Sequence, residues 1–227
     1  GKWYTLVINK DGVKFEDASP LMGKGMYAVD EALWKAHPKT AVIGIGPAGE
    51  MKLSNAGISV NDIENRPGRY AGRGGMGAVM GARGVKAIVV DDTGGPVVEI
   101  ADRKLFDEGS KKLTESILEH DLTKVGGALP SYGTAVLVNL INEAGGLPTR
   151  NFSAGQFEGA AKISGEAIAE VVAKRCPEGK GEGAVGHNCH PGCIIKCSNI
   201  YPDEKGNHLV SCLEYETAWA LGANCGI

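Results

Sequence analysis

Three cysteines within one nine-residue stretch set the tightest constraint on how this chain can fold. Cys189, Cys193 and Cys197 follow the spacing C-x3-C-x3-C in the segment NCHPGCIIKC. These short intervals let three sulfur atoms on one loop converge on a single metal centre. Iron–sulfur clusters take cysteine ligands from compact runs of this kind, with a further ligand supplied from elsewhere. We therefore expect a metal-binding loop here.

The spacing leaves the identity of the metal open. Zinc accepts three cysteines and a histidine, and His187 and His190 both lie nearby. We favour iron–sulfur over zinc because structural zinc sites usually pair C-x2-C units. A third interpretation is three unrelated buried thiols. The isolated cysteines are Cys176, Cys212 and Cys225, and each is interpreted as a small buried side chain. Alternatively, Cys212 or Cys225 could complete the site.

Glycine is the second constraint, with 34 residues in a chain of 227, about twice the usual share. The densest segment is Arg69–Ile88, RYAGRGGMGAVMGARGVKAI. Successive main-chain amides around glycines form anion-binding nests. Basic side chains add positive charge there: Arg69, Arg73, Arg83 and Lys86. This suits a phosphate or pyrophosphate, but a structural turn beside solvated arginines explains the spacing equally well.

Two nucleotide-binding patterns are not favoured. The segment Gly44–Gly49 spells G-x-G-x-x-G after a predicted strand, but Met51–Ile58 has no helical periodicity to follow it. We therefore expect a structural turn. The dense glycine segment lacks the Lys-Ser/Thr ending of a P-loop, which argues against ATP.

Charge and hydropathy exclude two classes of partner. The formal net charge is −3 and the isoelectric point is about 6.0, whereas phosphate-backbone binding needs a basic surface. No apolar run approaches the ~18 residues of a membrane span. Clustered thiols favour metal in a reducing compartment. We expect a cytoplasmic protein with neither nucleic acid nor membrane as partner.

The pattern of elements predicts an α+β fold in two parts. Residues 1–97 form a β-rich part, and residues 98–227 form a mostly helical part. In the first part we expect a hairpin of Tyr4–Ile8 and Val13–Phe15 through Lys10-Asp11-Gly12. We also expect a helix at Met26–Ala36 and two buried strands at Thr40–Ile45 and Val85–Val90. The expected helices of the second part are Asp102–Ile117, Thr134–Ala144, Gly165–Lys174 and Glu214–Asn224.

Several segments together resemble the tungsten-pterin aldehyde ferredoxin oxidoreductase family. They are the glycine-arginine segment, PSYGTAVLVNLIN at Pro130–Asn142, and EYETAWALGANCGI at Glu214–Ile227. GPAGE at Gly46–Glu50, Asn151-Phe152 and the cysteine run occur in the matching order. The resemblance covers nearly the whole chain, and its glycine-arginine and EYET-WALGAN motifs are specific.

The resemblance implies an architecture and a chemistry. Residues 1–97 correspond to the C-terminal part of a β-rich pterin-binding base domain. Residues 98–227 correspond to the N-terminal part of the helical domain with the iron–sulfur cysteines. The implied cofactors are a tungsten bis-pterin (molybdenum stays open), a [4Fe–4S] cluster and magnesium. The implied reaction oxidises a small aldehyde to a carboxylic acid. Its electron acceptor is ferredoxin or another electron carrier and not molecular oxygen, as in anaerobic metabolism. A homo-oligomeric parent stays open.

The family's functional residues carry over by position. Cys189, Cys193 and Cys197 fall on three cluster ligands, although the family's usual first interval is one residue shorter. The stretch that falls on a main-chain pterin-binding loop is Arg69, Tyr70, Ala71, Gly72, Arg73, Gly74 and Gly75. Tyr70 occupies the position whose carbonyl helps to hold magnesium. Glu216 falls on the acid beside the metal, whereas Glu214 is expected to be structural.

The resemblance also implies an internal piece of a longer enzyme. The start of the base domain is expected before Gly1. The fourth cluster cysteine, the second pterin's aspartate motifs and a histidine partner of the catalytic acid are expected after Ile227. The isolated piece is then inactive. Alternatives are a relative acting on another carbonyl or within a reductase complex, and a non-catalytic iron–sulfur or zinc module.

Overall fold

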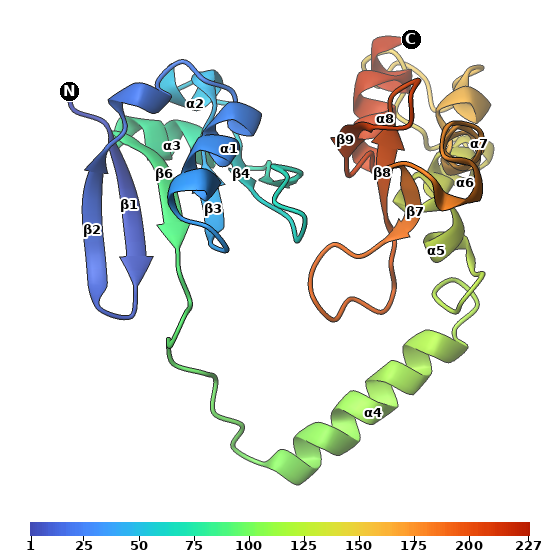
Figure 1. Ribbon diagram of the computed structural model, residues 1–227. Helices are drawn as coiled ribbons and strands as arrows, with labels where there is room; N and C mark the ends of the chain where they lie inside the picture. Colours follow the sequence, from blue (N-terminus) through green and yellow to red (C-terminus); the bar gives the residue numbers. More distant parts are fainter. The chain divides into compact units, whose positions relative to one another are not determined.

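A computed structural model describes residues 1–227, which divide into two compact units, Gly1–Glu99 and Ile100–Ile227 (Figure 1). Each unit has its own sheet and core. The change of unit falls two residues after the position expected from the sequence. The α+β class is confirmed, because a mixed sheet with helices occupies the first unit and helices with a small sheet occupy the second.

The first unit is built on a six-stranded mixed sheet in the order β2-β1-β6-β3-β4-β5. Strand β1 pairs in parallel with β6, and every other neighbouring pair is antiparallel. The expected hairpin is present, with Asn9 opposite Gly12 around its turn. The strands are β1 (Tyr4–Asn9), β2 (Gly12–Asp17), β3 (Ala41–Gly44), β4 (Ile58–Val60), β5 (Arg69–Ala71) and β6 (Val85–Val90).

Helix α1 (Met26–Ala36) covers the centre of this sheet and forms the main core of the unit. It buries Val29 and Leu33 against Val42 of β3 and Val89 of β6. The helix matches its expected bounds, because its apolar residues recur at helical spacing. Two short helices were not expected from the sequence: α2 (Pro47–Glu50) and α3 (Met76–Ala82).

Lys86 of β6 is fully buried, an exceptional position for a lysine. Its ammonium donates to Glu50 Oε1 at 2.5 Å, to the Ile45 carbonyl at 2.6 Å and to the Lys24 carbonyl at 3.1 Å. The Glu50 carboxylate also accepts from the backbone N–H of Gly23. All three protons of the ammonium therefore have acceptors, which compensates for the loss of hydration.

The second unit has five helices and two apolar clusters. One cluster joins Val138, Leu147, Phe157 and Ala218, and the other centres on Ile168. The helices are α4 (Arg103–Glu119), α5 (Ala128–Tyr132), α6 (Leu137–Glu143), α7 (Gly165–Arg175) and α8 (Tyr215–Leu221). Helix α4 is capped by Asp102 and buries no side chain. No helix of the chain is both long enough and apolar enough to cross a bilayer.

The sequence did not predict a three-stranded antiparallel sheet in this unit. Its order is β7-β8-β9, formed by Ala184–His187, Ser198–Pro202 and His208–Ser211. Each strand is short, and the residues around the first one are glycine-rich, so periodicity gave no signal. The expected helix Glu214–Asn224 is also shorter than predicted. It ends at Leu221, and a 3-10 turn follows from Ala223 to Cys225.

A buried acid on helix α1 stands out in the first unit. The side chain of Asp30 is 1% exposed, and neither carboxylate oxygen has a hydrogen-bond partner. Burial, with the nearby charge of Asp62, raises the pKa of Asp30 to about 7. An unfolded chain gives this carboxyl a pKa near ~3.9. The folded state therefore holds a proton that the unfolded state releases between these two values.

We predict that Asp30→Asn stabilises the chain at high pH. Because the folded pKa lies above the unfolded one, the native carboxyl favours folding below about pH 4 and loses that contribution as the pH rises to about 7. The variant's advantage should grow across that window, toward an upper limit of about 4 kcal/mol at pH 8. Urea unfolding at pH 5 and pH 8 measures it. Glu31→Gln, an exposed change on the same helix, is the control. An advantage for Asp30→Asn that does not change with pH would contradict the assignment.

Candidate functional site

The cysteine run forms the connection between two paired strands. Strand β7 ends at His187 and β8 begins at Ser198, so residues 188–197 are the loop of a hairpin. His187 and Ser198 face each other in the ladder, and both are buried. The ends of the loop are therefore fixed by the sheet. This gives the cysteines a rigid base that the sequence pattern alone did not reveal.

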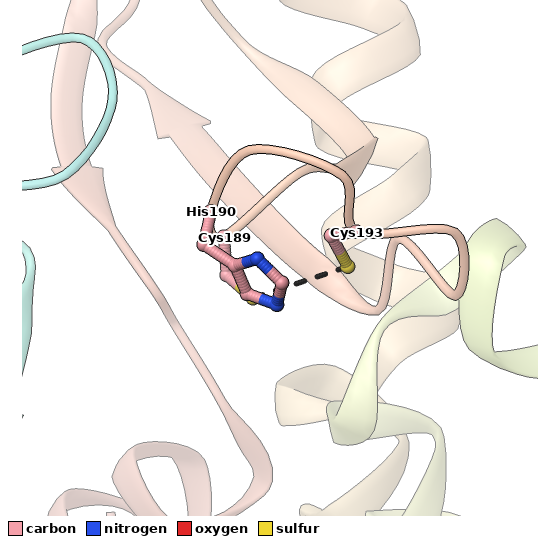
Figure 2. A group of neighbouring side chains, drawn as sticks. All are labelled: Cys189, His190 and Cys193. Atoms are coloured by element: carbon pink, nitrogen blue, oxygen red, sulfur yellow. Dashed lines mark hydrogen bonds between the residues drawn. The ribbon is translucent and has the colours of Figure 1, made fainter. Parts of the chain in front are cut away.

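Within the loop, Cys189, His190 and Cys193 lie together. Their ligand atoms all lie within 4.8 Å of one another, and the two sulfur atoms are 4.0 Å apart. Figure 2 shows the imidazole of His190 facing Cys193 across the loop. Cys197, at the base of the loop, is not a member of this close group. The structure thus brings together two of the three expected ligands, with a histidine that the sequence suggested only for zinc.

The surroundings of the thiols differ. Burial alone would raise the pKa of the Cys193 thiol, but hydrogen bonds from the backbone amides of Lys196, Cys189 and Ile195 and from the Cys189 thiol outweigh it and lower that pKa. Burial raises the pKa of Cys197, and the charges of Glu214, Cys189 and Cys193 add to the effect. Cys197 therefore lies within electrostatic reach of the other two. Backbone amides directed at a thiolate are a usual feature of cluster-binding loops.

The PSYGT motif packs against the base of this loop. A Cβ added at Gly133 would lie 2.9 Å from the carbonyl oxygen of Cys197, so only glycine fits there. Thr134 Oγ1 donates to the Glu214 carboxylate and accepts from the Tyr215 backbone N–H at 3.1 Å. Two motifs that are distant in sequence thus meet beside the third cysteine.

Strand β8 completes this junction through a buried asparagine. Asn199 Nδ2 donates to the Leu213 carbonyl at 2.8 Å, and its Oδ1 accepts from the Leu213 backbone N–H at 3.1 Å. Asn199 and Leu213 therefore join the strand after the cysteines to the segment before helix α8. Sequence reasoning missed Thr134 and Asn199, although the position of Thr134 within a specific motif was an available signal.

The two candidate acids have different surroundings. Glu214 lies at the start of α8 and holds Thr134, which fits the structural role expected for it. Glu216 is exposed in the first turn of the same helix. Its assignment as the catalytic acid stays a prediction, since no residue that would confirm it lies beside it in the second unit.

The glycine-arginine segment is part strand, part turn and part helix. Arg69–Ala71 is the edge strand β5, and Met76–Ala82, expected as loop, is helix α3. The glycines of this helix have a packing role. A Cβ at Gly81 would lie 2.0 Å from the Gly49 carbonyl oxygen, and one at Gly77 would lie 2.3 Å from the Gly57 carbonyl oxygen. Close packing of α3 on Gly49 of α2 and on Gly57 therefore accounts for two of the six glycines of the segment.

The turn before this helix is different. Gly72 and Gly74 have open space where a Cβ would lie, and Arg73 beside them is exposed. Gly75, with φ of 64°, begins the helix in the left-handed conformation. Residues 72–74 therefore have open space around their main chain, whereas Gly75 packs against the Ser54 carbonyl oxygen, 2.2 Å from where its Cβ would lie. The G-x-G-x-x-G segment runs from the end of strand β3 into the short helix α2, which the sequence did not predict, and Gly49 packs there on Ile45 and the Gly77 carbonyl oxygen.

The remaining cysteines of the chain have other surroundings. Cys176 is buried and donates to the Gly206 carbonyl at 3.6 Å, and Cys225 donates to the Ala220 carbonyl at 3.4 Å. Cys212 lies 3.6 Å from the hydroxyl of Ser198. None belongs to the close group of the loop.

Family models match both units of the chain. One described as aldehyde ferredoxin oxidoreductase, N-terminal domain, matches residues 1–92, and another, domains 2 and 3 of the same enzyme, matches residues 108–227. Similar curated proteins are tungsten-containing aldehyde ferredoxin oxidoreductases. That of Pyrococcus abyssi is 41% identical over 98% of this chain, and that of Pyrococcus furiosus is 37% identical over the same share. The chain spans about one third of their length, 33% and 34% respectively.

A solved structure has a similar fold. It is the active site complex BamBC of benzoyl coenzyme A reductase with 1,5-dienoyl-CoA. The TM-score is 0.59 at 24% identity, over 93% of this chain and 31% of that one.

We predict that Thr134→Val destabilises the second unit by about 1–3 kcal/mol, because Glu214 and the Tyr215 amide lose their shared partner. Thermal unfolding measures the loss. Thr134→Ser keeps the hydroxyl and should retain most of the stability. Equal effects of the two substitutions would show that packing of the methyl group, and not the hydrogen bonds, holds this junction.

Proposed function

The chain belongs to the aldehyde ferredoxin oxidoreductase family, and from that premise we propose that it is part of a tungstopterin enzyme that oxidises aldehydes to carboxylic acids. In this reaction the aldehyde takes an oxygen atom from water and releases two electrons and two protons. The electrons leave through a [4Fe–4S] cluster to ferredoxin or another carrier. The observation that carries the proposal is the match of both units to one family, with its motifs adjacent in the fold.

The cysteine loop supplies the cluster ligands in this proposal. Cys189 and Cys193 already lie close together, and Cys197 lies at the fixed base of the loop. Thiolates are the ligands that iron–sulfur clusters prefer. The amides of Lys196 and Ile195, which are directed at Cys193, would stabilise the charge on a cluster sulfur ligand. The donor set therefore fits the group. The six cysteines are free, which suits the cytoplasm.

The first unit supplies part of the pterin and magnesium site. Strand β5 lies at the edge of its sheet, so one row of its main-chain groups is unpaired. Tyr70, whose side chain is exposed, would offer its carbonyl oxygen to magnesium, a metal that prefers oxygen ligands. The open space at Gly72 and Gly74 would let main-chain amides approach the pterin phosphates, and Arg69 and Arg73 would supply positive charge. These features fit the cofactor.

Glu216 is the proposed proton acceptor. When bound, the tungsten pterin supplies the two-electron oxidation. Glu216 would remove a proton as water adds to the aldehyde carbonyl. A positioned carboxylate suits this role. Other parts of the parent enzyme would close the site around it. Glu214, bound to Thr134, would hold the start of helix α8 and so set the direction in which Glu216 projects.

We predict that Cys193→Ser in the parent enzyme loses the cluster, because serine oxygen is a poor substitute for a thiolate ligand. Iron content should fall by about four atoms per chain, the content of one cubane, and the visible absorbance of the cluster should disappear. Cys225→Ser, an exposed change outside the loop, should retain full iron. Full iron in Cys193→Ser would remove this residue from the ligand set.

We predict that Glu216→Gln retains tungsten and iron but lowers kcat at least ~100-fold, the usual worth of general acid–base catalysis. The matched control is Glu170→Gln, an exposed carboxylate on α7, which should leave kcat unchanged. Steady-state aldehyde oxidation with a dye acceptor measures both. A fully active Glu216→Gln would refute the catalytic assignment and leave the metal assignments standing.

A further inference from the structure

We propose that Phe152 and Trp219 form an apolar subsite beside Glu216, which binds the side chain of the aldehyde and favours substrates with an aromatic or bulky apolar group. The inference rests on the proposed function, because Glu216 marks the place where the aldehyde carbonyl reacts. It gives a role to Asn151-Phe152, which belongs to the resemblance but holds no proposed cofactor.

The backbone that carries Phe152 is strained. Arg150, Asn151 and Phe152 have φ angles of 46°, 56° and 62°, so three consecutive residues other than glycine are left-handed. This conformation is unfavourable for each of them and exceptional for a bulky aromatic residue. Such residues persist only where surrounding contacts hold them, and they cluster at active sites and ligand clamps. The run is therefore a candidate for a functional role.

The contacts that hold this run join it to the end of helix α8. The backbone N–H of Arg150 donates to the Ala223 carbonyl at 2.9 Å, and that of Asn151 donates to the Asn224 carbonyl at 2.8 Å. The Arg150 guanidinium lies 5.7 Å from the centre of the Phe157 ring, which belongs to the core of the unit. The residue that follows is therefore fixed in position relative to α8.

The ring of Phe152 lies against Trp219 of α8. The two ring centres are 5.8 Å apart and the planes meet at 74°, the edge-to-face arrangement that aromatic pairs prefer. Trp219 also contacts Tyr215, with ring centres 6.5 Å apart. Even so, the Phe152 side chain is 67% exposed and takes no part in the apolar core of its unit. The strained backbone thus presents an aromatic ring outward, beside a tryptophan.

This aromatic surface begins one helical turn from Glu216. Residues three apart are neighbours on a helix surface, and Trp219 follows Glu216 by three in α8. Burial raises the pKa of Tyr215, and the negative charge of Glu216 adds to the increase, so the phenol lies within electrostatic reach of the carboxylate. A substrate whose carbonyl lies at Glu216 would place its side chain on the rings of Trp219 and Phe152.

The chemistry of the surface defines the class of side chain that it favours. Neither ring carries a charge, and aromatic surfaces gain most from contact with other rings and with apolar groups. The methyl group of acetaldehyde is too small to cover both rings. The phenyl group of benzaldehyde can stack on them. Binding of this kind acts on the ground state and the transition state alike, so its loss should appear in KM rather than in kcat.

The test uses the parent enzyme purified without oxygen, with benzaldehyde and acetaldehyde as substrates and a dye as electron acceptor. In Phe152→Gly, which removes the ring and suits left-handed backbone, the ratio of the kcat/KM values for benzaldehyde and acetaldehyde should fall about tenfold, through KM for benzaldehyde. Phe152→Tyr retains the ring and should keep the native ratio. Phe106→Ala, a change of an exposed ring on α4, is the matched control and should also keep it.

The outcomes separate the subsite from the proposed function. An unchanged ratio in Phe152→Gly, at native tungsten and iron content, overturns the subsite and leaves the proposed function intact. Loss of tungsten or iron in Phe152→Gly would show that another segment of the parent enzyme packs on this ring, and that result also overturns the subsite. A native enzyme that holds tungsten and iron but oxidises neither aldehyde overturns the proposed function.

Discussion

The buried ammonium of Lys86 is the interaction on which the first unit depends. A charge with no access to water is stable only if every proton has an acceptor, and Lys86 finds three acceptors on two separate segments. It thereby joins strand β6 to the start of α1 and to the GPAGE segment. Helix α3 packs on that segment through the contact of Gly81 with Gly49. The buried ion pair therefore holds the segment on which helix α3, and with it the turn before that helix, is packed.

The second unit uses strand pairing and side-chain hydrogen bonds to the same end. Pairing of His187 with Ser198 fixes the ends of the cysteine loop, and Thr134 and Asn199 join its base to the start of helix α8. The proposed cluster ligands and the proposed acid Glu216 are therefore carried by one connected piece of structure. In both units, some glycines of these motifs lie where a main-chain carbonyl leaves no room for a Cβ, as Gly81 does against Gly49 and Gly133 does against Cys197.

Sequence reasoning succeeded where periodicity was long and strong, as for α1, whose bounds match, and for the strand Val85–Val90. It failed on β7 to β9, which are four or five residues long and are determined by pairing rather than by pattern. Helix α3 was hidden because its glycines, which disfavour helix, are required by packing on Gly49 and Gly57. The cysteine spacing identified the loop, but spacing does not show which side chains of the loop lie together, and the structure groups His190 with Cys189 and Cys193. Asp30 gave no signal because burial of a single acid depends on tertiary packing.

The measurement that tests this account most directly is elemental analysis of the parent enzyme, purified without oxygen, for tungsten, molybdenum, iron and zinc. The account predicts tungsten or molybdenum together with about four iron atoms per chain, the content of one cubane cluster. Zinc in the absence of iron and tungsten would contradict it, because the cysteine loop would then hold a structural ion and the proposed oxidation of aldehydes would have no cofactor.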